Sequence, residues 1–183
     1  AAGWEFGLAL STASLCPPGF PDNFECRQIL VGSSISNVIS NLGATREAGE
    51  PLHAGISGTN SLWYSWTAPA TGGVVIQATG GSQFASPILA VYIGTDLGTL
   101  TNVAFNFSPF ANNQFPLNKA RVAFTAIAGQ TYQIAVDGLP TSIYESQGNV
   151  TFTLTLAPPP ANDLLQNATP ITGIYYDKTN GTF

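Results

Sequence analysis

The only histidine of the chain, His53, is the first side chain to consider for acid–base chemistry, because imidazole changes charge near neutral pH. It follows Glu50 by three residues within a long polar stretch. A hydrolase needs a nucleophile beside an oriented base, and the sequence has no Gly-x-Ser-x-Gly elbow to present one. The pattern therefore favours an ordinary loop residue, or a hydrogen-bond partner of Glu50, over a catalytic His53, and the sequence predicts no enzyme.

Cys16 and Cys26 are the only cysteines, and they flank a proline-rich segment. In a secreted chain a single pair most often forms one disulfide. A metal site of two cysteines would lack a nearby histidine to complete it. We expect a disulfide between Cys16 and Cys26 and an extracellular or cell-surface location.

Calcium is bound by several clustered oxygen ligands. Asp22-Asn23, Asn162-Asp163 and Asp137 offer such oxygens, but without the alternating spacing of a calcium loop. Asn and Asp before an apolar run more often form Asx-turns. We predict no cofactor, and calcium remains an open alternative.

Four Asn-x-Ser/Thr sequons are candidate glycosylation sites. If the source organism glycosylates, they would place sugar on the outside of a protein that has few charges to keep it soluble. The asparagines are Asn106, Asn149, Asn167 and Asn180.

The composition suits a β-rich extracellular protein with many turns. Charged residues are only 8% of the 183 residues, while there are 19 glycines and 13 prolines. The net charge of −5 comes from scattered side chains, so no basic stripe could bind nucleic acid. No apolar run reaches the roughly 18 residues of a membrane helix. The length and a hydrophobic content of 44% fit one domain with a sizeable core.

The segment 61–69 is predicted to be the strand on which the core is built, because it holds two of the three tryptophans. Side chains alternate along a strand, so Leu62, Tyr64 and Trp66 should share one face. Trp63 should then lie on the other. These aromatics are expected in the core, and an aromatic binding platform on one face is the alternative.

Further strands are indicated by apolar alternation and by turn residues between short apolar runs. They are predicted at 5–11, 29–31, 34–42, 74–79, 87–93, 100–105, 121–126, 131–137 and 149–156, with long loops at 43–55 and 106–118. Residues 128–130 are predicted as the hairpin turn between 121–126 and 131–137. No helical period appears, so the sequence predicts an all-β fold, a two-sheet antiparallel β-sandwich of jelly-roll type.

Both ends of the chain repeat parts of its middle. Residues 158–165 resemble 17–24, and the pattern Phe6, Leu8, Leu10 repeats that of the strand 149–156. We therefore expect three parts: 1–16 as the terminal strand of a preceding repeat, 17–157 as the β-sandwich domain, and 158–183 as the start of a following repeat or a strand that packs on a neighbour.

The polar stretch followed by Trp63-Tyr64-Ser65-Trp66 begins a series of collinear matches at 43–55, 61–69, 89–94, 121–124, 129–138 and 148–154. Over about residues 20–157 the chain thus resembles the bacterial pre-peptidase C-terminal-like domain family. The resemblance implies a secreted, non-catalytic β-sandwich that commonly occurs in tandem or appended to secreted enzymes and cell-surface proteins. Some relatives bind calcium or matrix polymers, but no ligand set of theirs matches positions here.

From the repeats we expect a structural module of an extracellular bacterial surface protein or filament, in which copies join head to tail through terminal strands. A window of a covalent tandem array and a lone domain are the alternatives for the ends. The residues expected in the assembly strands are Phe6, Leu8, Leu10, Ile171, Ile174, Tyr175 and Phe183.

A rival function is an accessory domain of a secreted enzyme that binds carbohydrate or protein. It would use exposed aromatic side chains, for which Trp63, Tyr92 and the loop from Phe107 to Phe115 are the candidates.

Overall fold

The computed structural model describes residues 16–81, 87–107, 118–140 and 146–159. Within these ranges the chain forms strands and two short 3-10 helices, and neither helix is long and apolar enough to cross a membrane. The elements are η1 (Phe24–Cys26), β1 (Gln28–Leu30), β2 (Ser34–Ser40), β3 (Leu62–Thr67), β4 (Gly72–Gly80), β5 (Pro87–Ile93), η2 (Leu97–Thr99), β6 (Thr101–Phe107), β7 (Lys119–Ala126), β8 (Thr131–Gly138) and β9 (Asn149–Ala157).

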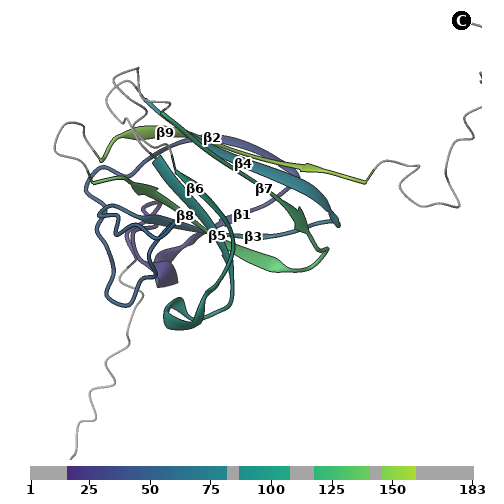
Figure 1. Cartoon of the computed structure of the whole chain (residues 1–183), viewed down its shortest axis with the longest axis horizontal. Helices are drawn as coiled ribbons and strands as arrows, with labels where there is room; N and C mark the ends of the chain where they lie inside the picture. Colours follow the sequence, from purple (N-terminus) through teal and green to yellow (C-terminus); the bar gives the residue numbers. More distant parts are fainter. Residues whose placement is uncertain (1–15, 82–86, 108–117, 141–145, 160–183) are drawn as a thin grey trace, which may run out of the picture.

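The strands form two sheets that face each other (Figure 1). One has the order β1-β3-β8-β5-β6 and the other the order β2-β9-β4-β7. From β2 to β5 and from β6 to β9 each successive strand changes sheet, which is the arrangement of a jelly roll. The predicted sandwich is confirmed. All its strand pairs are antiparallel except β1 with β3, which is parallel.

The tryptophan strand lies as predicted. Leu62, Tyr64 and Trp66 of β3 point into the principal core between the sheets, while Trp63 points to the outer face of the five-stranded sheet and packs in a second core. On the opposite sheet, β9 alternates buried and open positions along its length. The period-two pattern thus places the side chains correctly on both sheets.

The predicted hairpin between 121–126 and 131–137 is wrong. Both strands exist, but β7 pairs with β4, and β8 pairs with β3 and β5 in the other sheet. The turn at Gly129 carries the chain across the sandwich, and its amide donates to the carbonyl of Ala68 at 2.8 Å. Alternation shows which face of a strand is buried, but it does not show the strand's partner.

The expected disulfide is present: Cys16 and Cys26 are bonded, with their Cα atoms 5.1 Å apart. The bond ties the segment before η1 to the last residue of η1, just ahead of β1. Short loops of this kind restrict the unfolded chain and so stabilise the folded one.

We expect the double substitution Cys16→Ser with Cys26→Ser to lower the free energy of unfolding by about 2–3 kcal/mol, the loop-closure value for a sequence separation of 10. Denaturant titrations with and without a reductant measure this change. The reductant should not change the stability of the double variant, whereas it should lower the stability of the natural chain. Equal stabilities in all four titrations would contradict the assignment.

Candidate functional site

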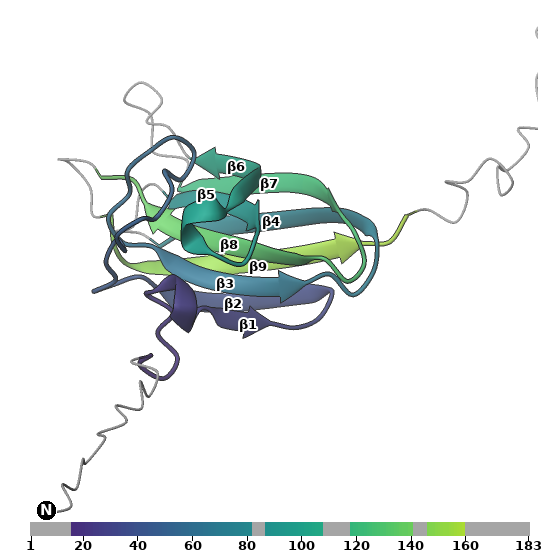
Figure 2. The same ribbon diagram turned by 90° about the horizontal axis from the view of Figure 1, so that it is seen from below.

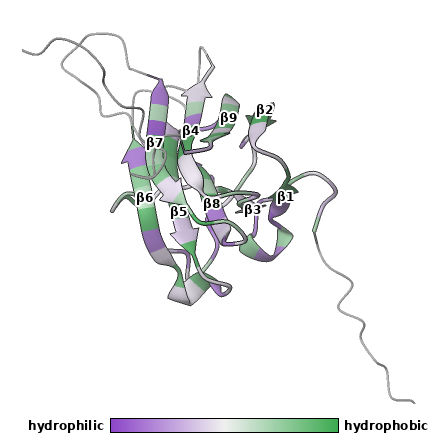
Figure 3. Ribbon diagram, turned by 90° about the vertical axis from the view of Figure 1, so that its right-hand side faces the viewer, coloured by the Kyte–Doolittle hydropathy of each residue, from purple (hydrophilic) through white to green (hydrophobic). Residues whose placement is uncertain are grey.

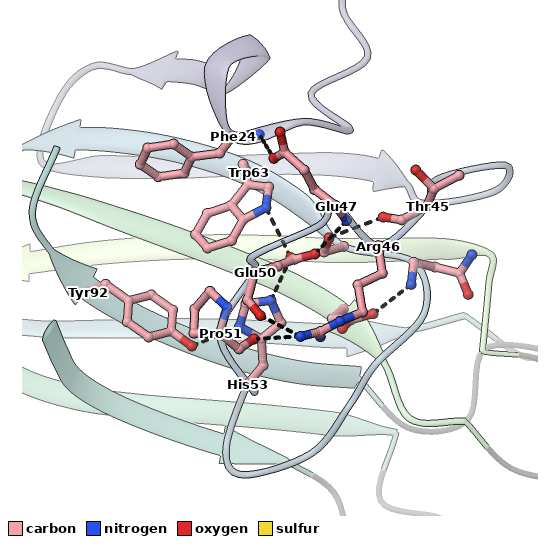
Figure 4. Close-up of polar contacts among 12 residues, drawn as sticks. Phe24, Thr45, Arg46, Glu47, Glu50, Pro51, His53, Trp63 and Tyr92 are labelled. Carbon is pink, nitrogen blue, oxygen red and sulfur yellow. Dashed lines mark hydrogen bonds and ion pairs between the residues drawn. The ribbon is translucent and has the colours of Figure 1, made fainter. Parts of the chain in front are cut away.

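The polar stretch between β2 and β3 covers the outer face of the five-stranded sheet. It lies over a second, smaller core whose buried members are Phe24, Trp63, Ala90, Tyr92 and Ala135. Side chains from this loop turn inward instead of facing water, as Figure 4 shows. The side chains considered for acid–base chemistry, His53 and Glu50, therefore lie between this loop and the sheet.

His53 is fully buried, and both of its ring nitrogens are occupied (Figure 4). Its Nε2 lies 2.8 Å from Glu50 Oε1 and its Nδ1 lies 2.7 Å from the Tyr92 hydroxyl. Of the two ordinary roles expected for His53, the hydrogen bond to Glu50 is the one that the structure contains. Since neither nitrogen faces solvent, the ring is arranged to join the loop to β5 and not to receive a substrate.

The Glu50 carboxylate is the centre of this cluster. Besides His53 it accepts the indole N–H of Trp63 at 3.1 Å and the backbone N–H of Glu47 at 2.9 Å. Burial raises the pKa of a carboxyl, but here the hydrogen bonds from His53 and Ser61 outweigh it and hold the pKa of Glu50 below its ordinary value. Glu50 is therefore an ionised acceptor held by surrounding donors.

Two charged side chains close to Glu50, those of Arg46 and Glu47, form further hydrogen bonds. Arg46 donates through Nη2 to the carbonyl oxygens of Glu50 and Pro51, and Glu47 accepts the backbone N–H of Phe24 at 2.9 Å. The loop is thus bound to η1 on one side and closed on itself on the other. These contacts satisfy polar groups of the loop, while Arg46 Nη1 is buried without a hydrogen-bond partner.

A second buried polar group lies at the end of β8. Asp137 Oδ1 accepts the backbone N–H of Asn60 at 2.9 Å and that of Gly138 at 2.7 Å, and Oδ2 is buried without a hydrogen-bond partner. Burial raises the pKa of Asp137 despite these two hydrogen bonds. The residue fixes the entry of the loop into β3.

Asn41 and Asn60 complete this end of the loop. Asn41 Nδ2 donates to the carbonyls of Asn60 at 3.0 Å and Ser146 at 3.1 Å, and Asn41 Oδ1 accepts the N–H of Gly148. Sequence reasoning gave neither asparagine a role. In the sequence each is only a polar residue next to a strand end. Such residues are also typical of solvent-exposed turns, so they do not indicate a buried hydrogen-bonding role.

The aromatic residues proposed for ligand binding are mostly inaccessible. Trp63 is 0% exposed and Tyr92 is 2% exposed, so the binding platform considered for them is wrong. Both cover the sheet beneath the loop, and their polar atoms bond within it. Of the aromatic loop, Phe107 is half-buried at the end of β6, and the rest lies outside the described residues.

The described residues hold no group of three or more His, Cys, Asp or Glu side chains placed to bind one metal ion. Asp22 is used within the fold, where it accepts the N–H and the hydroxyl of Thr45. An open groove of about 450 Å³ beside η1 is lined by Phe24, Glu25, Arg27, Glu47, Thr95, Asp96 and Leu97. Its charges are of both signs, which is typical of a solvated surface.

Two of the four sequon asparagines fall on the described chain. Asn106 is exposed on β6 and Asn149 is exposed at the start of β9. The other sequon asparagines, the predicted strand 5–11 and the expected assembly residues lie outside the described residues, namely Asn167, Asn180, Phe6, Leu8, Leu10, Ile171, Ile174, Tyr175 and Phe183.

One side of the sandwich is open. The edge strands β6 and β7 pack against each other on one side, and β1 and β2 lie on the opposite side (Figures 2 and 3). Four of the large exposed apolar side chains of the described residues belong to this part of the chain: Ile29, Val31, Val38 and Leu42, at 69–84% exposure. This side is the chain's candidate interaction surface.

No family model matches the sequence, and no curated protein sequence matches it either. Solved structures similar to it include the pre-peptidase C-terminal domain of a collagenase from Bacillus anthracis, with a TM-score of 0.41 and 14% identity over 72% of this chain and 96% of that one. CorA, a surface-associated copper-binding protein of Methylomicrobium album, is similar with a TM-score of 0.48 and 12% identity over 71% of this chain and 97% of that one.

A third similar structure is the K3 cleaved adhesin domain of Lys-gingipain from Porphyromonas gingivalis, with a TM-score of 0.33 and 13% identity over 66% of this chain and 91% of that one. The family that the sequence resembles is therefore also found among similar solved structures. At these identities the likeness concerns the fold alone.

Proposed function

We propose that this chain is a non-catalytic structural module of an extracellular bacterial surface protein or filament, and that copies of it join head to tail through terminal strands. The observation that carries the proposal is the open side of the sandwich at β1 and β2, where exposed apolar side chains are concentrated. Open sheet edges without protecting features readily pair with another chain.

The chemistry of the loop supports a structural role. The chain's single histidine is enclosed between Glu50 and Tyr92, so it has no free nitrogen to serve as a base. The buried carboxylates of Glu50 and Asp137 hold the loop in place through backbone and side-chain donors. The disulfide between Cys16 and Cys26 suits an oxidising, extracellular location.

Glycans on Asn106 and Asn149 belong to the same proposal. Both side chains are exposed, and attached sugar would add polar surface to a module with 8% charged residues. Digestion with a glycosidase that removes N-linked sugar, followed by mass measurement, would detect them.

Denaturing mass determination combined with negative-stain microscopy of the native protein tests the assembly. A mass near 19.1 kDa together with long fibres is the expected result, and a chain that lacks both expected assembly segments, residues 5–11 and 170–183, should then form no fibres. A much larger denatured mass would mean a covalent tandem array instead of strand exchange. Absence of fibres at either mass would contradict head-to-tail association.

A further inference from the structure

The outer edge of β2 is built as an acceptor for another strand. In the described sandwich β2 pairs with β9 on one side only. The register joins the backbone groups of Ile35 and Asn37 to β9, because Ser33 and Leu156 form a hydrogen-bonded pair in the same ladder. The N–H and C=O groups of Ser36 and Val38 therefore point away from β9, toward the open side.

This edge has none of the features that usually protect edge strands. Charged side chains, prolines and bulges keep edges from pairing with other chains. No charged residue and no proline occurs between Arg27 and Arg46, a stretch that contains both β1 and β2. By contrast β7, the other edge of the same sheet, carries exposed Lys119 and Arg121 and packs against β6.

The inward face of β2 is also incompletely covered. Ile35 and Ile39 pack on the principal core but remain half-buried, and Asn37 between them is exposed although it shares their face. A neighbouring strand with apolar residues at alternate positions would cover these side chains. Its other face would lie beside Ser34, Ser36 and the exposed Val38, so small side chains are expected there.

Residues 5–11 have this pattern. Phe6, Leu8 and Leu10 alternate with Glu5, Gly7, Ala9 and Ser11. The same spacing of Phe, Leu and Leu occurs in β9 at Phe152, Leu154 and Leu156, and β9 already pairs with β2 from the other side. A strand with this alternation thus matches the pattern of the strand that β2 already pairs with.

We propose that the outer edge of β2 accepts residues 5–11 of a second copy of this chain, with Phe6, Leu8 and Leu10 directed inward against Ile35 and Ile39. The inference rests on the proposed head-to-tail association and names its contact. Main-chain hydrogen bonds give such strand addition its affinity, and the alternate side chains give it specificity. Donor and acceptor are different surfaces, so the contact propagates into a fibre.

Two full-length variants test the donor and the acceptor separately. Leu8→Asp places a charge on the inward face of the donor, and Ser36→Pro removes an N–H that points to the open edge without touching the ladder to β9. In sedimentation velocity over a concentration series, each is expected to raise the midpoint of association at least about tenfold, because one buried leucine or one lost backbone bond reaches that size.

Matched controls separate association from folding. Ser36→Ala keeps the N–H and should associate like the natural chain, and Leu8→Ile keeps the apolar face and should do the same. Thermal unfolding should show that Leu8→Asp and Ser36→Pro remain folded. Since each variant lacks a different half of the contact, their equimolar mixture should form dimers and stop there.

Other outcomes would contradict the acceptor edge, the donor segment or the assembly itself. If Ser36→Pro associates normally while Leu8→Asp does not, the β2 edge is the wrong acceptor and the proposed function still stands. If Leu8→Asp associates normally while Ser36→Pro does not, the edge accepts a different strand, such as residues 171–183 or β2 of another copy. A natural chain that stays monomeric at every concentration overturns both the contact and the proposed assembly.

Discussion

Replacement of Glu50 with alanine is expected to lower the free energy of unfolding by about 3–5 kcal/mol, because several buried donors lose their acceptor at a cost of about 1–3 kcal/mol each. The substitution would leave His53 Nε2, Trp63 Nε1 and the backbone N–H of Glu47 without their acceptor inside the loop. Denaturant titration followed by tryptophan fluorescence measures the loss, since Trp63 reports on the same cluster.

Glu25→Ala is the matched control, because Glu25 is exposed near the same loop and should change stability by less than about 0.5 kcal/mol. A loss for Glu50→Ala within the range of that control would contradict the structural role of the cluster. Such a result would mean that the loop does not depend on its buried carboxylate.

The difference in stability between the natural chain and Glu50→Gln, measured as a function of pH, shows whether the ionised carboxylate stabilises the fold. The folded pKa of Glu50 is below its ordinary value of 4.5, so the ionised carboxylate stabilises the fold above that pH. This contribution is lost as the pH falls through the folded pKa. The stability difference between the natural chain and Glu50→Gln should therefore be constant near neutrality and shrink below pH 4.5. A stability difference that grows on acidification would contradict a lowered pKa of Glu50 in the folded protein.

Gly58→Ala is the second substitution with a large expected effect. A methyl group at this position would lie 1.6 Å from Asp137 Oδ2 and 2.2 Å from its Cγ, far inside contact distance. Either the loop or the buried carboxylate must move, and movement of Asp137 breaks its bonds to Asn60 and Gly138. We expect a loss of about 3 kcal/mol or more, the sum of overpacking and unsatisfied backbone donors.

Gly73→Ala provides the control, because Gly73 lies in β4 with open space where the methyl group would go. It should be neutral or slightly stabilising. A double-mutant cycle with Asp137→Ala shows whether the overlap is the cause, since the penalty of Gly58→Ala should shrink when the carboxylate is absent. Strictly additive effects would contradict the direct contact.

Strand positions and buried faces could be predicted because they depend on local alternation. The alternation of Leu62, Tyr64 and Trp66 with Trp63 correctly predicted on which face of the strand each side chain lies. The partner of β8 could not be predicted, because a short turn at Gly129 can join strands in one sheet or in two. Which of these forms depends on contacts between residues far apart in the sequence.

Among the polar contacts under the loop, some could likewise be predicted from the sequence and others could not. The bond between His53 and Glu50 was predictable because the two residues are close in sequence. The contacts of Glu50 with Trp63, and of Asp137 with Asn60, join distant segments and leave no spacing to recognise. The sequence therefore predicts the long polar loop at 43–55 but not these contacts.

The most direct test of the account is amide hydrogen exchange at the outer edge of β2. The protein would be exchanged at low and at high concentration, quenched, and dissolved in a denaturing solvent for NMR. The N–H groups of Ser36 and Val38 should exchange rapidly in dilute samples and slowly in associated ones, while Asn37, already paired with β9, should be slow in both. Equal and rapid exchange of Ser36 and Val38 in the associated protein would contradict strand addition at this edge.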